Sequence, residues 1–568
     1  MVAAVAAASP APVAVPAKRS PFGTFAGSVV LPENDDQSHD APEAPAPTTA
    51  SKPVQRTGGL QRAPQPERKK VNYTEEQLGI QHSDAPLIVA DAFAGCGKTT
   101  AAVGYAEAKS QLGWKLLYVC LGNENAAEAR KRFPANTTCA TTHAVARKAI
   151  KPEDSRVTDN WKPMVVQDLL SISPREARLT MNVLAQFFNS SDTAISMDHV
   201  EIVNEKIDMT SAERMSAMSY AKLAWNRMQR PNDSMLIPHD AYLKMFALRA
   251  PTLPYDAIIF DEAQDANPVT LQILQGQRAV KQMLCIGDRH QGIFGFRGAV
   301  NAMEVLGAQA ERHFLTQTWR FGPKIANLAN LLLGELKGEE KKIQGLGKDG
   351  VWDESRHAHL TRTNAQLFRI ASERMGEGVH WVGGIDKYRV DQVMDAYHLF
   401  ARERHNIRNE FIKRKYQHWD EYVNYAEDAS DGEAKVLVKI VDDFKHDTPE
   451  LVAALKRNAV DSAKDASLIL TTGHRSKGME FANVRIGEDF ELLEKAEIAL
   501  ADNSPQDLPV QDINLLYVTL TRAMNALQLN PEFTAWIEKL DEHRQNRAAA
   551  RSRHEAAIQQ MRREIHRS

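Results

Sequence analysis

The segment "ADAFAGCGKTTAAV", from Ala90 to Val103, decides the fold of this chain. It continues the apolar run "PLIV" and opens a helix of small residues, which is the strand–loop–helix setting of a phosphate-binding loop. Gly95 and Gly97 let backbone N–H groups approach phosphate oxygens, and a helix N-terminus favours an anion. Ala92 stands where the usual pattern has its first glycine. A chance match at the start of a helix is therefore the alternative interpretation.

A second segment, "AIIFDEAQD", supplies the carboxylates that such a loop needs. After this hydrophobic strand, Asp261 would hold Mg²⁺ and Glu262 would accept a proton from the attacking water. Lys98 would neutralise the terminal phosphates of ATP, and the Thr99 hydroxyl would share the metal. Either carboxylate alone could simply lie in a solvated loop. Together the two segments predict an ATPase that uses Mg²⁺.

Composition places the chain among soluble globular proteins with several domains. Of its 568 residues, 43% are hydrophobic and 25% are charged, as is usual for that class. The net charge of -3 excludes a chain that is basic overall, so any nucleic-acid contact must come from a local groove. Four dispersed cysteines favour a reducing compartment over a disulfide framework. We expect a cytoplasmic protein with no membrane contact, because no apolar run is long enough to span a bilayer.

Short apolar runs alternate with helical patterns from about Val71 onward. This alternation indicates buried parallel sheets and predicts an α/β fold made of two units. Two polar helical stretches interrupt the alternation, and we interpret them as inserts, one in each unit. The expected boundaries are a disordered Ala/Pro-rich tail (1–70), a first unit (71–150 and 236–310) with its insert (151–235), a second unit (311–384 and 459–535) with its insert (385–458), and a basic helical tail (536–568).

The motifs, taken in order, resemble superfamily 1 helicases of the UvrD/Rep type, A branch, over nearly the whole globular chain. "AFAGCGKTT" resembles the phosphate loop of that family, "DEAQD" its second motif and "GDRHQGIFGFRGA" its third. "LTQTWRFGPKIANLAN", "TTGHRSKGMEF" and "LLYVTLTRA" resemble the fourth, fifth and sixth motifs. The Ala-Phe form of the loop is similar to the F-box DNA helicase subgroup, although no segment resembles an F-box. One match is weak evidence, whereas this many matches in order are specific.

The resemblance implies that the two units are RecA-like motor domains with ATP bound between them. Gln77 would read adenine, with Trp319 stacked on the base. Gln291 and Arg320 would sense the γ-phosphate, and Arg522 would act as the arginine finger. The expected catalytic residues are Lys98, Glu262, Gln291, Arg320 and Arg522. The expected nucleotide contacts are Gln77, Ala94, Gly95, Cys96, Gly97, Lys98, Thr99, Thr100, Trp319, Gly478 and Glu480, and the metal ligands are Thr99 and Asp261.

The same resemblance implies a face that contacts single-stranded DNA. Phe294 and Phe296 alternate beside Arg297, and aromatic side chains along a strand path let bases stack without sequence preference. Core packing is the alternative for either phenylalanine. The expected DNA contacts are Thr142, His143, Phe294, Phe296, Arg297 and His474.

The second helical insert contains Tyr416 and Trp419 among many charges, and Trp381 lies just before it. These aromatics could touch duplex DNA ahead of the motor, or they could form the small core of a solvated helical subdomain. The basic C-terminal tail could bind DNA or a partner, or it could be a solvated helix.

Three positions depart from the family pattern. Thr100 stands where many relatives have an arginine beside adenine, Glu124 replaces an expected lysine, and Asn514 replaces an arginine before "LLYV". None of these changes removes a residue that hydrolysis requires. They bear on nucleotide fit and on one DNA contact.

The resemblance therefore implies an ATP-dependent 3′–5′ single-stranded DNA translocase and helicase. Its partners would be single-stranded DNA and single-strand/duplex junctions, in repair, replication or recombination, and the protein would be DNA-associated. One alternative is a DNA-dependent ATPase that strips proteins from DNA. Another is an ATPase subunit of a repair or defence complex, which could bind protein partners through the N-terminal tail or the basic C-terminal tail.

Overall fold

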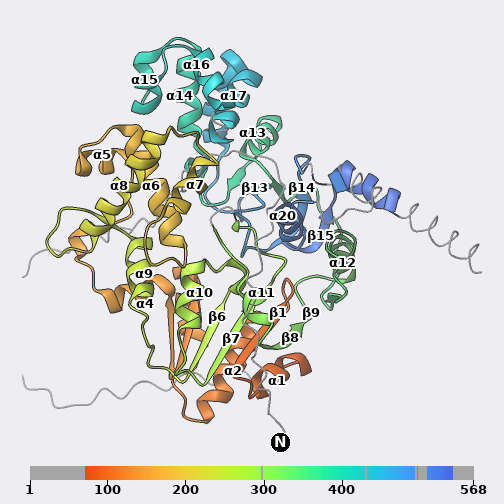
Figure 1. The fold of residues 1–568 in the computed structure, drawn as a ribbon. Coiled ribbons are helices and arrows are strands. Elements are labelled where there is room, and N and C mark those ends of the chain that lie inside the picture. Colours follow the sequence, from red (N-terminus) through yellow and green to blue (C-terminus); the bar gives the residue numbers. More distant parts are fainter. Residues whose placement is uncertain are drawn as a thin grey trace, which may run out of the picture.

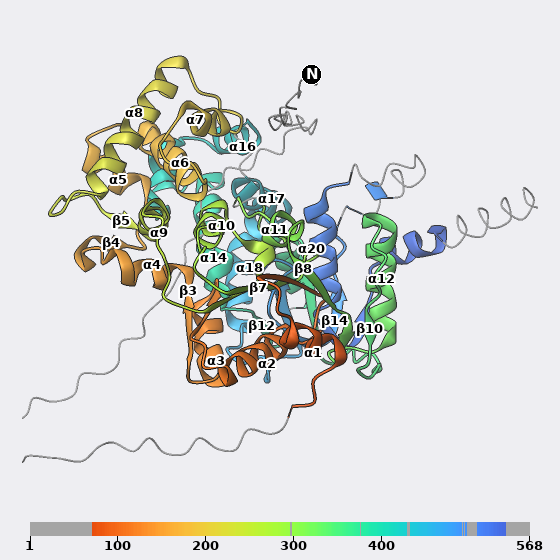
Figure 2. The same ribbon diagram turned by 60° about the horizontal axis from the view of Figure 1, so that its bottom comes forward.

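The computed structural model describes residues 71–540, apart from 296–297, 375, 429–431, 491, 493–494 and 497–507. Two parallel sheets form the middle of this part of the chain, and two groups of helices extend from them (Figure 1). In the turned view the helical group formed by residues 163–228 stands apart from the sheets, whereas the group formed by residues 390–458 overlaps them (Figure 2). The tail predicted over 1–70 and most of the tail predicted over 536–568 lie outside the described residues.

The first sheet has six parallel strands in the order β3-β2-β6-β7-β1-β8. Its strands are β1 (Leu87–Ala92), β2 (Leu116–Cys120), β3 (Thr137–Thr141), β6 (Ala257–Asp261), β7 (Gln282–Gly287) and β8 (Glu311–Leu315). Every residue of β2 and β6 is buried, because helices cover both faces of a parallel sheet. The carboxyl ends of all six strands meet at one edge, where a ligand site is expected in such a sheet.

Strand β8 corrects the boundary predicted at residue 310. It pairs in parallel with β1, from Ile88 opposite Glu311 to Ala92 opposite Leu315. Its sequence, ERHFL, begins with two exposed residues, since β8 is an edge strand of the sheet. It therefore lacks the continuous apolar run from which the central strands were predicted. The first unit extends at least to Leu315.

Helix α1 carries the first residue of the predicted site. The Thr74 hydroxyl accepts a hydrogen bond from the Gln77 N–H (3.2 Å), and the Gln77 side chain accepts one from the Thr74 N–H (3.1 Å). This capping box fixes both the start of the helix and the Gln77 side chain. The other helices of the unit follow the strands in α/β order. The helices of the first unit are α1 (Glu75–His82), α2 (Lys98–Gln111), α3 (Asn123–Arg132), η2 (Ala263–Asp265), α10 (Pro268–Gln275) and α11 (Ala302–Gly307).

The first insert is larger than the predicted range 151–235. Its buried cluster, centred on Phe187 and Trp225, also takes in Ala146 of α4 and Phe246 of α9. These two helices have apolar faces that pack on the insert, so the chain returns to the motor sheet only at β6. The elements of the insert are α4 (Thr142–Ile150), η1 (Asp154–Arg156), β4 (Val157–Thr158), α5 (Pro163–Leu170), α6 (Pro174–Asn189), α7 (Met197–Asn204), α8 (Ser211–Met228), β5 (Ile237–Pro238) and α9 (His239–Leu248).

The second sheet has five parallel strands in the order β12-β13-β11-β14-β15. With the first sheet it forms the α/β architecture of two parallel sheets, as predicted. Its strands are β11 (His357–Thr361), β12 (Val379–Trp381), β13 (Leu468–Thr472), β14 (Phe481–Ile486) and β15 (Ala523–Gln528). Its helices are α12 (Pro323–Lys337), α13 (Asn364–Glu373) and α20 (Val510–Leu520), and a small two-stranded sheet joins β9 (Gln317–Thr318) to β10 (Gln344–Gly345).

One hydrophobic cluster runs through both motor units. It includes Ile88 of β1, Leu360 of β11 and Leu516 of α20. The helix formed by residues 531–540 adds Trp536 and Leu540 to the same cluster. Residues 536–540, which were predicted to belong to the tail, therefore pack on the motor through these two buried apolar side chains.

The second insert packs on strands β12 and β13 around a shared aromatic cluster. Trp381 is 1% exposed and Tyr416 is 3% exposed, and Trp419 packs against the same cluster. The structure therefore favours the core interpretation of these aromatics over duplex contact. The elements of the insert are η4 (Ile385–Tyr388), α14 (Val390–Phe400), η5 (Arg404–Asn406), α15 (Glu410–Lys415), α16 (Trp419–Asp428), α17 (Gly432–Phe444), η6 (Lys445–Asp447) and α18 (Thr448–Asn458).

Across the described residues, every helix is too short or too polar to cross a bilayer.

Replacing Trp381 by alanine should lower the free energy of unfolding by about 3–5 kcal/mol, the usual cost of removing a large buried ring. The ring packs between Phe368 and Tyr388, with centroids 5.6 and 5.0 Å away. Urea denaturation followed by circular dichroism measures the change. Leu112→Ala is the control, because that side chain is 63% exposed and should matter by less than about 0.5 kcal/mol. Weaker DNA binding with an unchanged unfolding midpoint would contradict a core role.

Candidate active site

The loop between β1 and α2 has the backbone of a phosphate cradle. Gly95 and Gly97 have φ angles of +74° and +77°, a region that glycine adopts without steric cost. Gly97 precedes α2 and offers no side chain to cap it, so the first N–H groups of the helix can face an anion. Ala92 is the buried last residue of β1. It is part of the strand, which needs no glycine at that position.

The carboxylates predicted after β6 lie beside this loop. The Lys98 ammonium is 2.8 Å from Glu262 Oε1, and the Tyr118 hydroxyl donates a hydrogen bond to Asp261 Oδ2 at 2.5 Å. Glu262 has a φ of +55°, which is uncommon for a residue with a side chain and typical of strained functional positions. The parallel sheet thus brings Lys98, Asp261 and Glu262 together, as the motifs predict.

The surroundings of Asp261 and Glu262 shift the pKa values of these two carboxyl groups in opposite directions. Burial and the neighbouring Glu262 charge raise the pKa of Asp261. Burial acts in the same direction on Glu262, but Lys98 and Lys477 hold the pKa of Glu262 below its ordinary value. Glu262 is therefore ionised at neutral pH, which a proton acceptor requires. The two groups occupy one site with opposite tendencies to hold a proton.

The predicted adenine side of the site is formed by α1 and the segment at β9. Gln77 is 4% exposed, and a β-carbon on Gly97 would lie 2.9 Å from Gln77 Nε2. Gln77 therefore touches the phosphate loop directly. Trp319 is 55% exposed and so presents an open ring. Thr100 accepts a hydrogen bond from Arg132 at 3.4 Å.

The remaining positions predicted to contact nucleotide differ in exposure. Ala94 and Cys96 are buried, whereas Gly478 is exposed and has a φ of +83°. Thr99 is half-buried at the first turn of α2. Its position beside Lys98 fits the predicted metal ligand, and Asp261 ends the strand that faces the same loop.

Arg320 of the second unit lies against the loop, whereas Arg522 hydrogen-bonds within the second unit. A β-carbon on Gly95 would lie 2.7 Å from Arg320 Cβ, so Arg320 lies against the phosphate cradle. Its guanidinium pairs with Glu480 at 2.6 Å. Arg522 is 1% exposed and donates hydrogen bonds to the carbonyl oxygens of Val518 and Met479. Burial and the Arg320 charge lower the pKa of Arg522 to about 10, so it keeps its charge at neutral pH.

The described residues among the predicted DNA contacts lie on separate elements of the fold. Thr142 and His143 begin α4, and the His143 ring lies 3.0 Å from an Asp240 carboxylate oxygen within the insert. His474 is half-buried in the loop after β13. Phe294 is half-buried and packs against the motor core. Phe296 and Arg297 lie outside the described residues.

Lys477 is a site residue that the sequence reasoning missed. It belongs to the second unit, forms an ion pair with Asp265 and donates a hydrogen bond to the Gln291 carbonyl at 2.7 Å. Its ammonium also lies 5.1 Å from the centroid of the Phe294 ring. One lysine thus joins the second motif, the predicted γ-phosphate sensor and a predicted base-stacking residue. The motif "TTGHRSKGMEF" contains it, but nothing in the sequence shows which residues it faces.

Asn514 has a structural role that explains its departure from the pattern. It accepts a hydrogen bond from Lys337 (2.8 Å) and donates one to the Gly292 carbonyl (2.8 Å). Burial lowers the pKa of Lys337 to about 8, and an arginine at 514 would add a second cation there. The neutral amide satisfies both partners.

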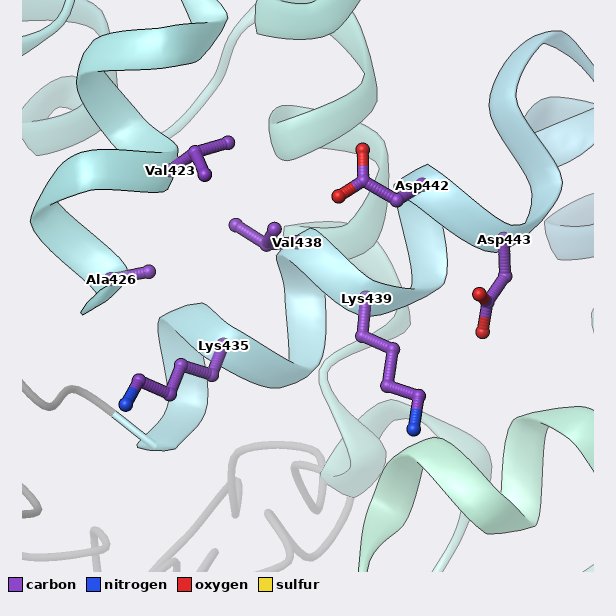
Figure 3. Close-up of a pocket in the computed structure, with 7 residues that line it drawn as sticks. All are labelled: Val423, Ala426, Lys435, Val438, Lys439, Asp442 and Asp443. Carbon is purple, nitrogen blue, oxygen red and sulfur yellow. The ribbon is translucent and has the colours of Figure 1, made fainter.

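A surface pocket elsewhere in the chain does not contribute to this site. It lies between α16 and α17 in the second insert (Figure 3). Its lining residues are Val423, Ala426, Lys435, Val438, Lys439, Asp442 and Asp443. None of these residues belongs to a motif.

The comparisons with known proteins agree with the motifs. Residues 73–305 match the family model described as the UvrD/REP helicase N-terminal domain. The chain is 31% identical over 523 residues to F-box DNA helicase 1 of Gallus gallus, covering 84% of this chain and 50% of that protein. It is 29% identical over 528 residues to F-box DNA helicase protein 1 of Schizosaccharomyces pombe, covering 83% and 59%. The chain thus spans about half the length of the curated relatives it matches.

Asp91 lies in β1, just before the phosphate loop, and its burial makes the stability of the fold depend on pH. Its carboxylate is buried without a hydrogen-bond partner, and Arg289 and Arg312 lie 3.8 and 3.6 Å away. Burial raises the pKa of Asp91 to about 6. The folded state therefore holds its proton more tightly than the unfolded state, so stability is lost as pH rises from about 4 to 6.

Asp91→Asn should remove that loss, raising the free energy of unfolding at pH 8 by about 1–3 kcal/mol and changing it little at pH 4.5. Thermal unfolding at both pH values measures the difference. Asp84→Asn, at an exposed aspartate, is the matched control. An equal shift at both pH values would contradict the assignment.

Proposed function

Because this chain belongs to the UvrD/REP family of helicases, we propose that it uses ATP hydrolysis to move along single-stranded DNA and to unwind duplexes. This proposal rests on one observation: charged residues of both units lie together at the phosphate loop. Lys98 and Glu262 come from the first unit, and Arg320 comes from the second and lies against the phosphate loop. Such a site senses the nucleotide from both sides.

The chain's own residues support each part of hydrolysis. The loop around Gly95 and Gly97 would bind phosphate oxygens through backbone N–H groups, and Lys98 would add a positive charge. Glu262, ionised beside Lys98, would take the proton of the attacking water. Thr99 and Asp261 would hold Mg²⁺, which when bound neutralises phosphate charge.

The two units would be RecA-like motor domains. The Arg320 and Arg522 guanidiniums would stabilise charge on the transferring phosphoryl group, so that loss of the γ-phosphate releases a contact between the units. We propose 3′–5′ movement, which rests on the family resemblance alone. We also expect DNA to contact Phe294, His143 and His474, and this too rests on the family resemblance.

Lys98→Ala and Glu262→Gln should each lower the DNA-stimulated ATPase kcat by about 100-fold or more, as expected when one preorganised charge is removed from such a site. Steady-state phosphate release with and without a single-stranded oligonucleotide is the measurement. Lys115→Ala is the control, because this exposed lysine precedes β2 at the opposite edge of the sheet. A high ATPase rate that does not change when single-stranded DNA is added would refute the motor proposal.

Unwinding of 3′-tailed and 5′-tailed duplexes tests the direction. Activity on the 3′-tailed duplex alone supports the proposal, and activity on the 5′-tailed duplex alone contradicts it.

A further inference from the structure

Tyr517 reaches from the second unit into the first. It lies on α20, which packs against α12 and β14 (Figure 1), and its side chain is fully buried. Its hydroxyl accepts a hydrogen bond from the Ala94 N–H of the phosphate loop at 3.0 Å. The same hydroxyl donates one to Asp288 Oδ2 at 3.1 Å. Both partners of the phenol oxygen thus belong to the first unit.

Asp288 extends this contact to the predicted γ-phosphate sensor. Its Oδ2 also accepts a hydrogen bond from the Gln291 side chain at 2.7 Å. Its backbone N–H donates to the Gln264 side chain at 3.0 Å, and Gln264 donates to Glu262. A continuous set of hydrogen bonds therefore joins Tyr517 to the sensor and to the candidate base.

The tyrosine ring is held in one orientation. The His290 ring meets it edge-on at 5.8 Å and stacks on Phe93 at 5.6 Å. His290 in turn lies 2.9 Å from Glu339, which follows α12. With the ring fixed by packing, the hydroxyl has little freedom to move away from the phosphate loop.

The position of Tyr517 on its helix links this contact to the arginines. Arg522 follows α20 in the chain, and the Thr521 carbonyl accepts a hydrogen bond from Arg320 at 3.3 Å. A shift of α20 would therefore move the phenol and both arginines together. Core packing alone needs only the ring, which phenylalanine would also supply.

We propose that Tyr517 is a positioning residue that holds the phosphate loop and Gln291 in register with the arginines of the second unit. This inference rests on the proposed function and adds the contact that couples the two units. The Tyr517 hydroxyl, which belongs to the second unit, sets the position of the phosphate loop in the first unit. Substrate itself would be bound by other groups.

Tyr517→Phe keeps the ring and removes the two hydrogen bonds. We expect the DNA-stimulated kcat to fall by about 2- to 10-fold, as expected from the net value of a buried hydrogen bond. The KM for ATP should change by less than about 2-fold, because the phosphate-binding groups are retained. The measurement is ATPase kinetics with a single-stranded oligonucleotide, together with the ATP consumed per base pair unwound, which should rise.

Tyr388→Phe is the matched control. This tyrosine, at the start of the second insert, is also buried, and its hydroxyl lies 3.1 Å from the Val382 carbonyl and 3.3 Å from the Leu470 carbonyl, remote from the motifs of the first unit. It should leave kcat and KM unchanged while costing comparable stability. Equal kcat losses in the two variants would overturn the proposal.

A double-mutant cycle with Asp288→Asn tests the contact from its other end. Both variants disturb the bond between Tyr517 and Asp288, so the loss in the double variant should be smaller than the two single losses combined. Additive losses would overturn the proposal. If Tyr517→Phe does not fold, the test uses Asp288→Asn alone. A kcat of Asp288→Asn equal to that of the unmodified chain would then overturn the proposal.

The unmodified chain separates this inference from the proposed function. If it hydrolyses ATP without any response to DNA, the proposed function fails. If it responds normally and Tyr517→Phe responds equally, only the inference about Tyr517 fails.

Discussion

The pairing of Lys98 with Glu262 in a site largely closed to water is the constraint on which the rest of the structure depends. The two side chains are 16% and 24% exposed, and charges so poorly solvated must be matched. Lys98 also begins α2, where the helix dipole disfavours a cation. A carboxylate must therefore stand opposite the helix end. The parallel sheet provides it, because the loops after β1 and β6 leave the same edge.

Positive charges of the second unit are also paired with carboxylates. Its Lys477 is matched by the buried Asp265 carboxylate, and its Arg320 by Glu480. These pairs place opposite charges on both sides of the phosphate loop, so a change in charge there alters the balance between the units. Under the proposed function, such a change would couple the chemical step to a motion between the units. The Tyr517 hydroxyl adds an uncharged contact to the same interface.

Residue type and local spacing explain why much of this site could be predicted. Gly95, Gly97 and Lys98 depend on a loop conformation and a helix start that a few neighbouring residues determine. Asp261 and Glu262 follow an apolar run whose burial is evident from its composition. The prediction assigned edge strand β8 to the wrong unit for the opposite reason. Its sequence is polar and carries no signal of a buried strand. The predicted bounds of the first insert were also too narrow. Helices α4 and α9 lie outside those bounds but pack on the core of the insert.

By itself, then, the sequence determined two α/β units, a phosphate loop, its carboxylates and the ordered motifs, because these are local patterns. Only the tertiary structure decided that β8 belongs to the first unit, that Trp381 is part of the core, and that Asn514 joins Lys337 of its own unit to Gly292 of the other. It also decided that Tyr517 meets Ala94, a residue 423 positions away. Contacts at such separations depend on how whole elements pack, and no spacing along the chain encodes them.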